Sequence, residues 1–206
     1  MTQAIREICS WGQGKFDGWI IPKAVYRRYN GKDTVRFQTR LLAHRRRYVR
    51  VQTIGYTAAG TENQCLEVTL IHSPPGEKAC GSGKDEPGNP DENAAGLCAD
   101  EDCSAGGLSF SVKGLKQFLW ESGDTNPLHQ GEPALVPGLW ILETLYGPYA
   151  RTLCPVELAI RFLCPLYTGQ QIVLKGNHGS VSGVCGSCTY FHMTIQSISI
   201  GGNHED

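Results

Sequence analysis

A carboxylate and an imidazole lie five residues apart in the stretch from Ser122 to His129, which reads Ser-Gly-Asp-Thr-Asn-Pro-Leu-His. Because Gly123 and Pro127 prevent a regular helix here, we expect Asp124 and His129 to lie on a loop. Together the two groups can accept and donate protons near neutral pH when burial and neighbouring charges tune them. The pair is therefore a candidate general acid and base.

A helix is predicted directly after this stretch, over the apolar run from Leu139 to Tyr146. The N–H groups of a first helical turn have no partner within the helix, so they can bind an oxygen anion. An acid/base pair beside such an anion site is suited to proton transfer next to a carbonyl group. The helix is apolar nearly all round, which predicts that a sheet wraps it before Gly147-Pro148 ends it.

Hydrophobic periodicity predicts the elements that must position these groups. Residues 1–33 show no regular pattern. A second helix is expected between a Ser111 cap and Gly123, with Val112, Leu115, Phe118 and Leu119 on one face. Strands are expected from their alternation over residues 35–41, 48–54, 66–71, 156–162, 171–175 and 189–200.

Charge divides the chain into three parts. Residues 1–72 carry twelve Lys/Arg against five Asp/Glu, residues 73–107 carry two against eight, and residues 108–206 carry five against seven. The middle part is rich in Pro and Gly as well as acidic, which is typical of a loop or linker. We therefore predict a strand-rich N-terminal module, a linker and a C-terminal domain with these boundaries.

The motif resembles that of the MaoC-like hydratases and dehydratases, also called (R)-specific enoyl hydratases, of the hotdog fold. Their motif is Ser-Gly-Asp-x-Asn-Pro-x-His, and this chain has each fixed position. The resemblance continues through residues 158–169, where Arg161-Phe162, Pro165 and Gly169 stand as in the family's next strand. It covers about half the chain, roughly residues 108–200.

The resemblance implies an α+β chain in which antiparallel strands curl around a central helix. Residues 1–72 would then be a partial hotdog half that lacks its helix and motif, so that the whole chain is double-hotdog-like. It also implies that hotdog units pair, within one chain or as a homodimer, and we expect a homodimer.

The resemblance also implies roles for the motif residues. Asp124 and His129 would be the catalytic dyad that holds a water, and the Gly138 N–H would bind the thioester oxygen. Asn126 would fix the loop geometry or orient the site, as an oxyanion or substrate-binding residue. The remaining motif positions would support the site, and they are Ser122, Gly123 and Pro127.

The function implied is that of a lyase, which hydrates an enoyl thioester or dehydrates a 3-hydroxyacyl thioester on coenzyme A or an acyl carrier protein. No cofactor or metal is called for. Two departures affect the acyl pocket: Pro137-Gly138 stands where the family has His-Gly, and the segment from His129 to Gly138 is short. They favour a bulky or polyketide-derived acyl group. A thioesterase, a polyketide-tailoring dehydratase or cyclase, and a non-catalytic acyl-binding subunit remain alternatives.

Composition narrows the class of protein further. No apolar run reaches 18 residues, which argues against a membrane span. A net charge of −1 without a recognition motif argues against nucleic acid as a partner. No secretory signal is visible at the first residues, which favours an intracellular, cytoplasmic protein.

The arginine cluster and the cysteines can each be interpreted in more than one way. Arg45-Arg46-Arg47 lies between predicted strands and is either a solvated turn or a patch for the phosphates of coenzyme A or a carrier protein. Because no secretory signal is visible, the nine cysteines are expected to be reduced thiols. The spacing of Cys185 and Cys188 could supply half of a zinc site, and Cys98 and Cys103 are more loosely spaced, so zinc is the less favoured interpretation.

Overall fold

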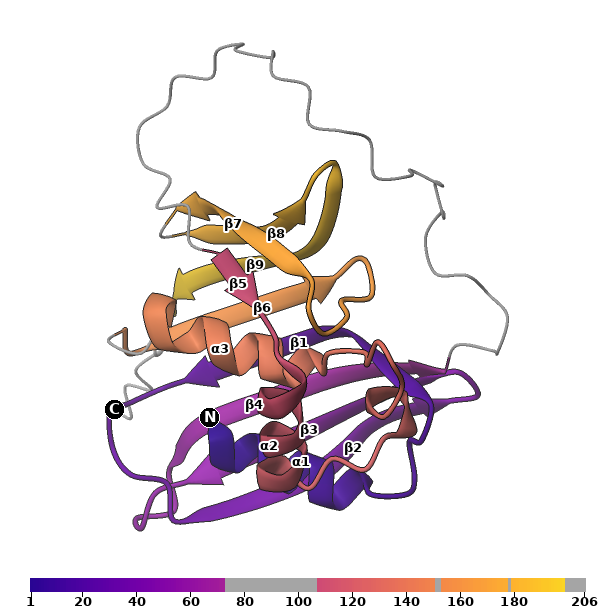
Figure 1. Ribbon diagram of the computed structural model, residues 1–206. Coiled ribbons are helices and arrows are strands. Elements are labelled where there is room, and N and C mark those ends of the chain that lie inside the picture. The colour runs from indigo at the N-terminus through magenta and orange to yellow at the C-terminus, as the bar shows by residue number, and fades with distance from the viewer. Residues whose placement is uncertain (73–106, 151–152, 178, 199–206) are drawn as a thin grey trace, which may run out of the picture.

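The computed structural model describes residues 1–72, 107–150, 153–177 and 179–198. These residues form a nine-stranded antiparallel sheet in the order β2-β3-β4-β1-β6-β9-β8-β7-β5, with helices packed on one side (Figure 1). The elements in chain order are α1 (Thr2–Gly12), β1 (Trp19–Arg28), β2 (Arg36–Arg45), β3 (Tyr48–Tyr56), β4 (Glu62–His72), β5 (Gly107–Ser109), α2 (Val112–Ser122), the 3-10 helix η1 (Pro127–His129), α3 (Gly138–Ala150), β6 (Val156–Phe162), β7 (Gln171–Asn177), β8 (Ser180–Cys185) and β9 (Cys188–Ser197).

The N-terminal half contains a helix, which corrects the expectation that this module lacks one. Helix α1 packs against β2, β3 and β4 and buries Ala4, Ile5 and Ile8. Three buried positions on a short helix make a narrow apolar face, and Met1 provides no side-chain cap. The cap signal is therefore absent, but Ala4, Ile5, Ile8 and Cys9 recur at helical spacing, so the sequence did contain an amphipathic pattern that the interpretation of residues 1–33 as irregular overlooked.

Strand β1 lies in the middle of the sheet, although no alternation predicted it. It pairs with β4 on one edge and with β6 on the other. Ala24, Val25 and Tyr26 are buried in succession because both faces of the strand are covered. Pro22 lies within the irregular step in the β1–β4 register between Ile20 and Lys23, where a missing N–H is tolerated.

The C-terminal half follows the sequence prediction closely. The Ser111 hydroxyl accepts a hydrogen bond from the Gly114 N–H, and Gly123 ends α2 in the left-handed conformation with φ of 71°. Helix α3 packs against β1 and β6 and buries Leu139, Ile141, Leu142 and Leu145. It runs on to Ala150 rather than ending at Gly147. Pro148 is tolerated because it lies in the last turn, where its missing N–H removes only one hydrogen bond.

Strands β6, β7 and β9 confirm the predicted strands, whereas β8 was not predicted. Strand β8 occupies a stretch rich in Gly and Ser and pairs with β7 and β9. A Cβ atom at Gly183 would collide with the ring of Phe191, its partner on β9. The glycine is therefore needed for the aromatic ring to cover the strand.

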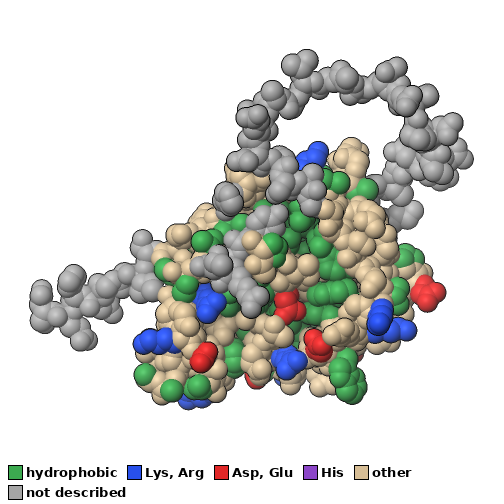
Figure 2. Space-filling view, turned by 60° about the vertical axis from the view of Figure 1, so that its left-hand side comes forward, with side chains coloured by type: hydrophobic (Ala, Val, Ile, Leu, Met, Phe, Trp, Pro, Cys, Tyr) green, Lys and Arg blue, Asp and Glu red, His purple; other side chains and the backbone are tan. Residues whose placement is uncertain are grey.

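The charged clusters lie at the surface. Arg45-Arg46-Arg47 occupies the end of β2 and the turn to β3, as expected. Figure 2 shows one face of the molecule with hydrophobic side chains gathered at its centre and charged side chains around and below them. The predicted acidic linker, residues 73–107, lies outside the described residues except for Gly107.

We expect Leu142→Ala to lower the free energy of unfolding by about 2–5 kcal/mol, because Leu142 is fully buried in α3 and its loss leaves a cavity. The matched control is Trp120→Ala in α2, where the side chain is 88% exposed. That change should stay within about 0.5 kcal/mol of the wild type. Chemical denaturation followed by circular dichroism measures both, and equal losses would contradict this packing.

Candidate active site

The motif begins where α2 ends. Ser122 is buried in the last helical turn, and its hydroxyl accepts a hydrogen bond from the Asp124 N–H at 3.3 Å. The left-handed conformation of Gly123 turns the chain out of the helix towards the site. These two residues therefore set the direction in which Asp124 leaves the helix. A supporting role for Ser122 and Gly123 stays a prediction.

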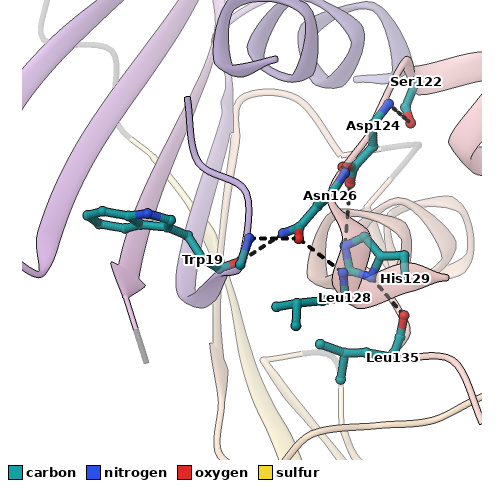
Figure 3. A network of polar contacts seen from close by, with 8 residues as sticks. Trp19, Ser122, Asp124, Asn126, Leu128, His129 and Leu135 are labelled. Atoms are coloured by element: carbon teal, nitrogen blue, oxygen red, sulfur yellow. Dashed lines mark hydrogen bonds and ion pairs between the residues drawn. The ribbon is translucent and has the colours of Figure 1, made fainter. Parts of the chain in front are cut away.

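Asp124 and His129 face each other, as Figure 3 shows. The Asp124 Oδ2 and His129 Nε2 atoms are 3.5 Å apart. The other carboxylate oxygen of Asp124 accepts a hydrogen bond from the Asn126 N–H at 3.0 Å. The backbone thus orients the carboxylate, and the imidazole lies beside it with only 8% of its surface exposed.

The position of the His129 proton follows from its second partner. Its Nδ1 atom lies 2.8 Å from the Leu135 carbonyl oxygen, which can only accept a hydrogen bond. Nδ1 must therefore carry the proton, and in the neutral ring Nε2 presents a lone pair towards Asp124. Two acceptors then face each other, so a molecule that donates to both, such as water, suits the space beside them.

Asn126 ties the motif loop to the N-terminal half. Its Oδ1 accepts hydrogen bonds from the N–H groups of Gly18 and Leu128, and its Nδ2 donates to the Trp19 carbonyl at 2.8 Å (Figure 3). Pro127 opens η1 at a position where its missing N–H is not needed. The Asn126 amide is thus engaged by the protein itself, which favours positioning over the predicted binding of an oxyanion or substrate.

Gly138 lies at the first turn of α3. In the described part of the chain its N–H donates to no acceptor, as expected at a helix start. A Cβ atom here would come within 2.9 Å of the Phe162 ring on β6, so only glycine fits. The segment before it is pinned, because the Val136 N–H donates to the Leu166 carbonyl at 2.8 Å.

These groups share one cavity of about 320 Å³. Its walls come from both halves of the chain and are mostly apolar. The N-terminal half contributes Ile8, Trp11, Phe16, Trp19 and Leu70, and the C-terminal half contributes Asp124, Asn126, His129, Gly138, Phe162 and Leu166. An apolar cavity with a few convergent polar groups is the usual form of a small-molecule site.

Sequence reasoning missed the contribution of α1 to this cavity. Cys9 lines it, and burial raises the pKa of the Cys9 thiol, as does the nearby Asp124 carboxylate, while a hydrogen bond with Ser122 lowers it. The net shift is upward, so the thiol stays neutral at neutral pH. The helical spacing of Ala4, Ile5 and Ile8 indicates the helix, but no local signal in the sequence places Cys9 next to the motif.

Among the described residues, no three His, Cys, Asp or Glu side chains are grouped as a metal site. Two of the cysteines considered for zinc, Cys98 and Cys103, lie outside those residues. None of the helices described is long and apolar enough to cross a membrane.

Comparison with solved structures identifies the fold. HtdX from Mycobacterium tuberculosis aligns with a TM-score of 0.66 and 16% identity over 96% of this chain and 86% of its own. A MaoC-like dehydratase aligns with a TM-score of 0.65 and 15% identity over 96% and 83%. This chain has the hotdog fold of the MaoC-like dehydratases. The α+β hotdog architecture expected from the motif is therefore confirmed.

A protein of another activity is also similar in structure. An acyl-ACP thioesterase from Bacteroides thetaiotaomicron aligns with a TM-score of 0.51 and 10% identity over 86% of this chain and 75% of its own. No known family profile matches the chain, and no curated protein sequence does. At such identities the likeness establishes the hotdog fold and leaves the reaction to the side chains of the site.

We predict that neutral His129 carries its proton on Nδ1, because the Leu135 carbonyl accepts from that atom. Long-range ¹H–¹⁵N correlation spectra of the imidazole should show the Nδ1–H tautomer when the pH is high enough for the ring to be neutral. His192 provides a comparison within the same spectrum, because its Nδ1 faces the Ser182 hydroxyl, which can either donate or accept. A proton found on Nε2 of His129 would contradict this geometry.

Asn126→Ala should loosen the motif loop, because the Gly18 and Leu128 N–H groups lose their shared acceptor. Leaving such donors without a partner costs about 1–3 kcal/mol of folding free energy. Denaturation measures that cost, and hydrogen exchange should show faster exchange of these two amides. The control is Asn30→Ala, since Asn30 accepts locally from Lys32 on an exposed turn. Equal effects of the two changes would contradict the tether.

Proposed function

We propose that this protein is a MaoC-like hydro-lyase, which hydrates an enoyl thioester or dehydrates a 3-hydroxyacyl thioester. The observation that carries the proposal is the pairing of Asp124 and His129, 3.5 Å apart, in a cavity that also contains the start of α3. Membership of the MaoC-like family is part of the proposal. It is supported by the complete motif and by the shared fold.

The first chemical step is the activation of water. A water that donates to His129 Nε2 and to Asp124 Oδ2 has its oxygen lone pairs free to attack C3 of the enoyl group. As the new C–O bond forms, Nε2 takes one proton, and the imidazolium is held between the Asp124 carboxylate and the Leu135 carbonyl. Each neighbour can accept a hydrogen bond from one of the two ring N–H groups.

The second step concerns the thioester end of the substrate. Attack at C3 moves electrons onto the thioester oxygen, and the Gly138 N–H at the start of α3 stabilises that developing charge. The protonated dyad then delivers a proton to C2, so that H and OH have been added across the double bond. Dehydration is the reverse sequence, in which the dyad removes the C2 proton and protonates the leaving hydroxide.

The mostly apolar cavity is consistent with an acyl thioester on coenzyme A or a carrier protein. Trp11, Phe16 and Trp19 form part of its wall, which suits a bulky acyl group, including one of polyketide origin. A tailoring dehydratase or cyclase on such a substrate would use the same groups. The homodimer and the intracellular, cytoplasmic location expected from the sequence stay predictions.

Thioester hydrolysis is the second candidate reaction, because an acyl-ACP thioesterase shares the fold. In that reaction the activated water would attack the carbonyl carbon rather than C3. Crotonyl-coenzyme A distinguishes the two, since hydration removes the enoyl absorbance and hydrolysis releases a thiol. A non-catalytic acyl-binding subunit would do neither and would bind ligand equally well with Asp124→Asn.

Asp124→Asn and His129→Gln should each lower kcat for enoyl-thioester hydration by about two or more orders of magnitude, as expected when a general acid/base is removed. The matched controls are Asp33→Asn and His192→Gln, which lie away from the cavity and should keep wild-type rates. Circular dichroism confirms that every variant is folded. Full activity in either dyad variant would overturn the assignment.

Gly138→Ala should lower kcat/KM strongly, because its Cβ atom would press against the Phe162 ring and shift the N–H that faces the substrate. A misplacement of about 1 Å can cost about 10²-fold in rate. Gly147→Ala is the control in the same helix, since nothing lies within 4 Å of a Cβ atom there. Similar kinetics for the two variants would contradict a role for the start of α3.

A further inference from the structure

Two thiols meet beside the cavity wall. Cys188, at the start of β9, donates an S–H···S hydrogen bond to Cys164, with the two sulfur atoms 3.4 Å apart. Both side chains are half-buried. Cys185 is opposite Cys188 across the β8–β9 hairpin, and it is exposed. The sulfur–sulfur contact therefore pairs Cys164 with Cys188 rather than with Cys185.

The backbone holds this pair in place. Cys164 follows the end of β6, and its N–H donates to the Tyr190 carbonyl on β9 at 3.2 Å, beside a bond of 2.8 Å from the Leu163 N–H to the same oxygen. On the other side, Gly186 has a φ of 56° and closes the two-residue turn of the hairpin. These backbone contacts hold the two sulfur atoms next to each other before any bond forms.

We propose that Cys164 and Cys188 form a modification site, a dithiol that a peroxide converts reversibly into a disulfide. The Cys188 thiolate attacks one oxygen of hydrogen peroxide, which gives a sulfenic acid and hydroxide. The Cys164 thiolate then attacks the sulfenic sulfur, the S–S bond forms and a second hydroxide leaves. Two thiols and one peroxide thus become one disulfide and two waters, and an external thiol reverses the reaction.

The site adjoins the proposed catalytic groups. Residues 162–166 line the cavity, so Cys164 belongs to its wall. Beyond it, the Leu166 carbonyl accepts from the Val136 N–H, and Leu135 forms a β-bridge with Tyr167. The Leu135 carbonyl in turn fixes His129. A tether at Cys164 therefore acts on the segment that orients the imidazole.

Closing the bond must move this wall. The sulfur atoms have to approach from 3.4 Å to about 2.05 Å, which is more than 1 Å. Misplacements of about 1 Å can cost up to about 10²-fold in rate. We therefore expect oxidation to lower kcat/KM by between about tenfold and 10²-fold, a part of the inference that rests on the proposed function.

Peptide mapping tests the disulfide without reference to activity. Trypsin cuts after Arg161 and Lys175, so Cys164 lies on peptide 162–175, and Cys185 and Cys188 lie together on peptide 176–206. After treatment with hydrogen peroxide, non-reduced wild type should give the two peptides linked, and dithiothreitol should separate them. Cys185→Ser should keep the link, and Cys188→Ser should lose it.

Two mapping results would overturn the proposal. One is peptide 176–206 lighter by two hydrogens and unlinked, which would mean a bond between Cys185 and Cys188. The other is a link that forms equally in Cys188→Ser. If the link forms and oxidised wild type keeps its kcat/KM, the effect on the site is refuted. If reduced wild type does not hydrate enoyl thioesters, the proposed function fails, and the mapping still decides the disulfide.

Discussion

Strand β1 is the constraint on which the rest of the molecule depends. It pairs with β4 on one edge and with β6 on the other, so one strand makes the two halves of the chain a single sheet. Its three consecutive buried residues show that both faces of the sheet are covered at this point. Only this arrangement brings α1 and the residues before β1 next to a motif more than a hundred positions later in the sequence.

The motif loop makes use of that junction. The side-chain oxygen of Asn126 accepts hydrogen bonds from two N–H groups, one within the loop and one at Gly18. Its side-chain nitrogen donates to the Trp19 carbonyl at the start of β1. The loop is thereby fixed to the sheet, and the fixed loop determines where Asp124 and His129 lie. The acidic and basic groups stay close because the backbone orients both, through the Asn126 N–H on one side and the Leu135 carbonyl on the other.

The sequence was informative where local chemistry determines structure. Ser111 and Gly123 mark the ends of α2, and three fixed residues of the motif, Asp124, Asn126 and His129, line the cavity. It was uninformative where tertiary contacts determine structure. Strand β1 has no alternation because the side chains on both its faces are buried. Strand β8 depends on Phe191, whose ring covers Gly183. Helix α1 depends on the sheet against which its apolar face packs. The contribution of Cys9 and Trp11 to the cavity follows from those long-range contacts.

The two departures from the family pattern have structural roles in this chain. Pro137 provides the carbonyl that accepts from the N–H groups of Trp140 and Ile141, and a residue without an N–H is suited to a helix start. The short segment after His129 crosses to residues 166–168, where the Ala134 carbonyl accepts from the Thr168 N–H and Leu135 pairs with Tyr167. These contacts hold the Leu135 carbonyl in place, and through it they orient the His129 imidazole.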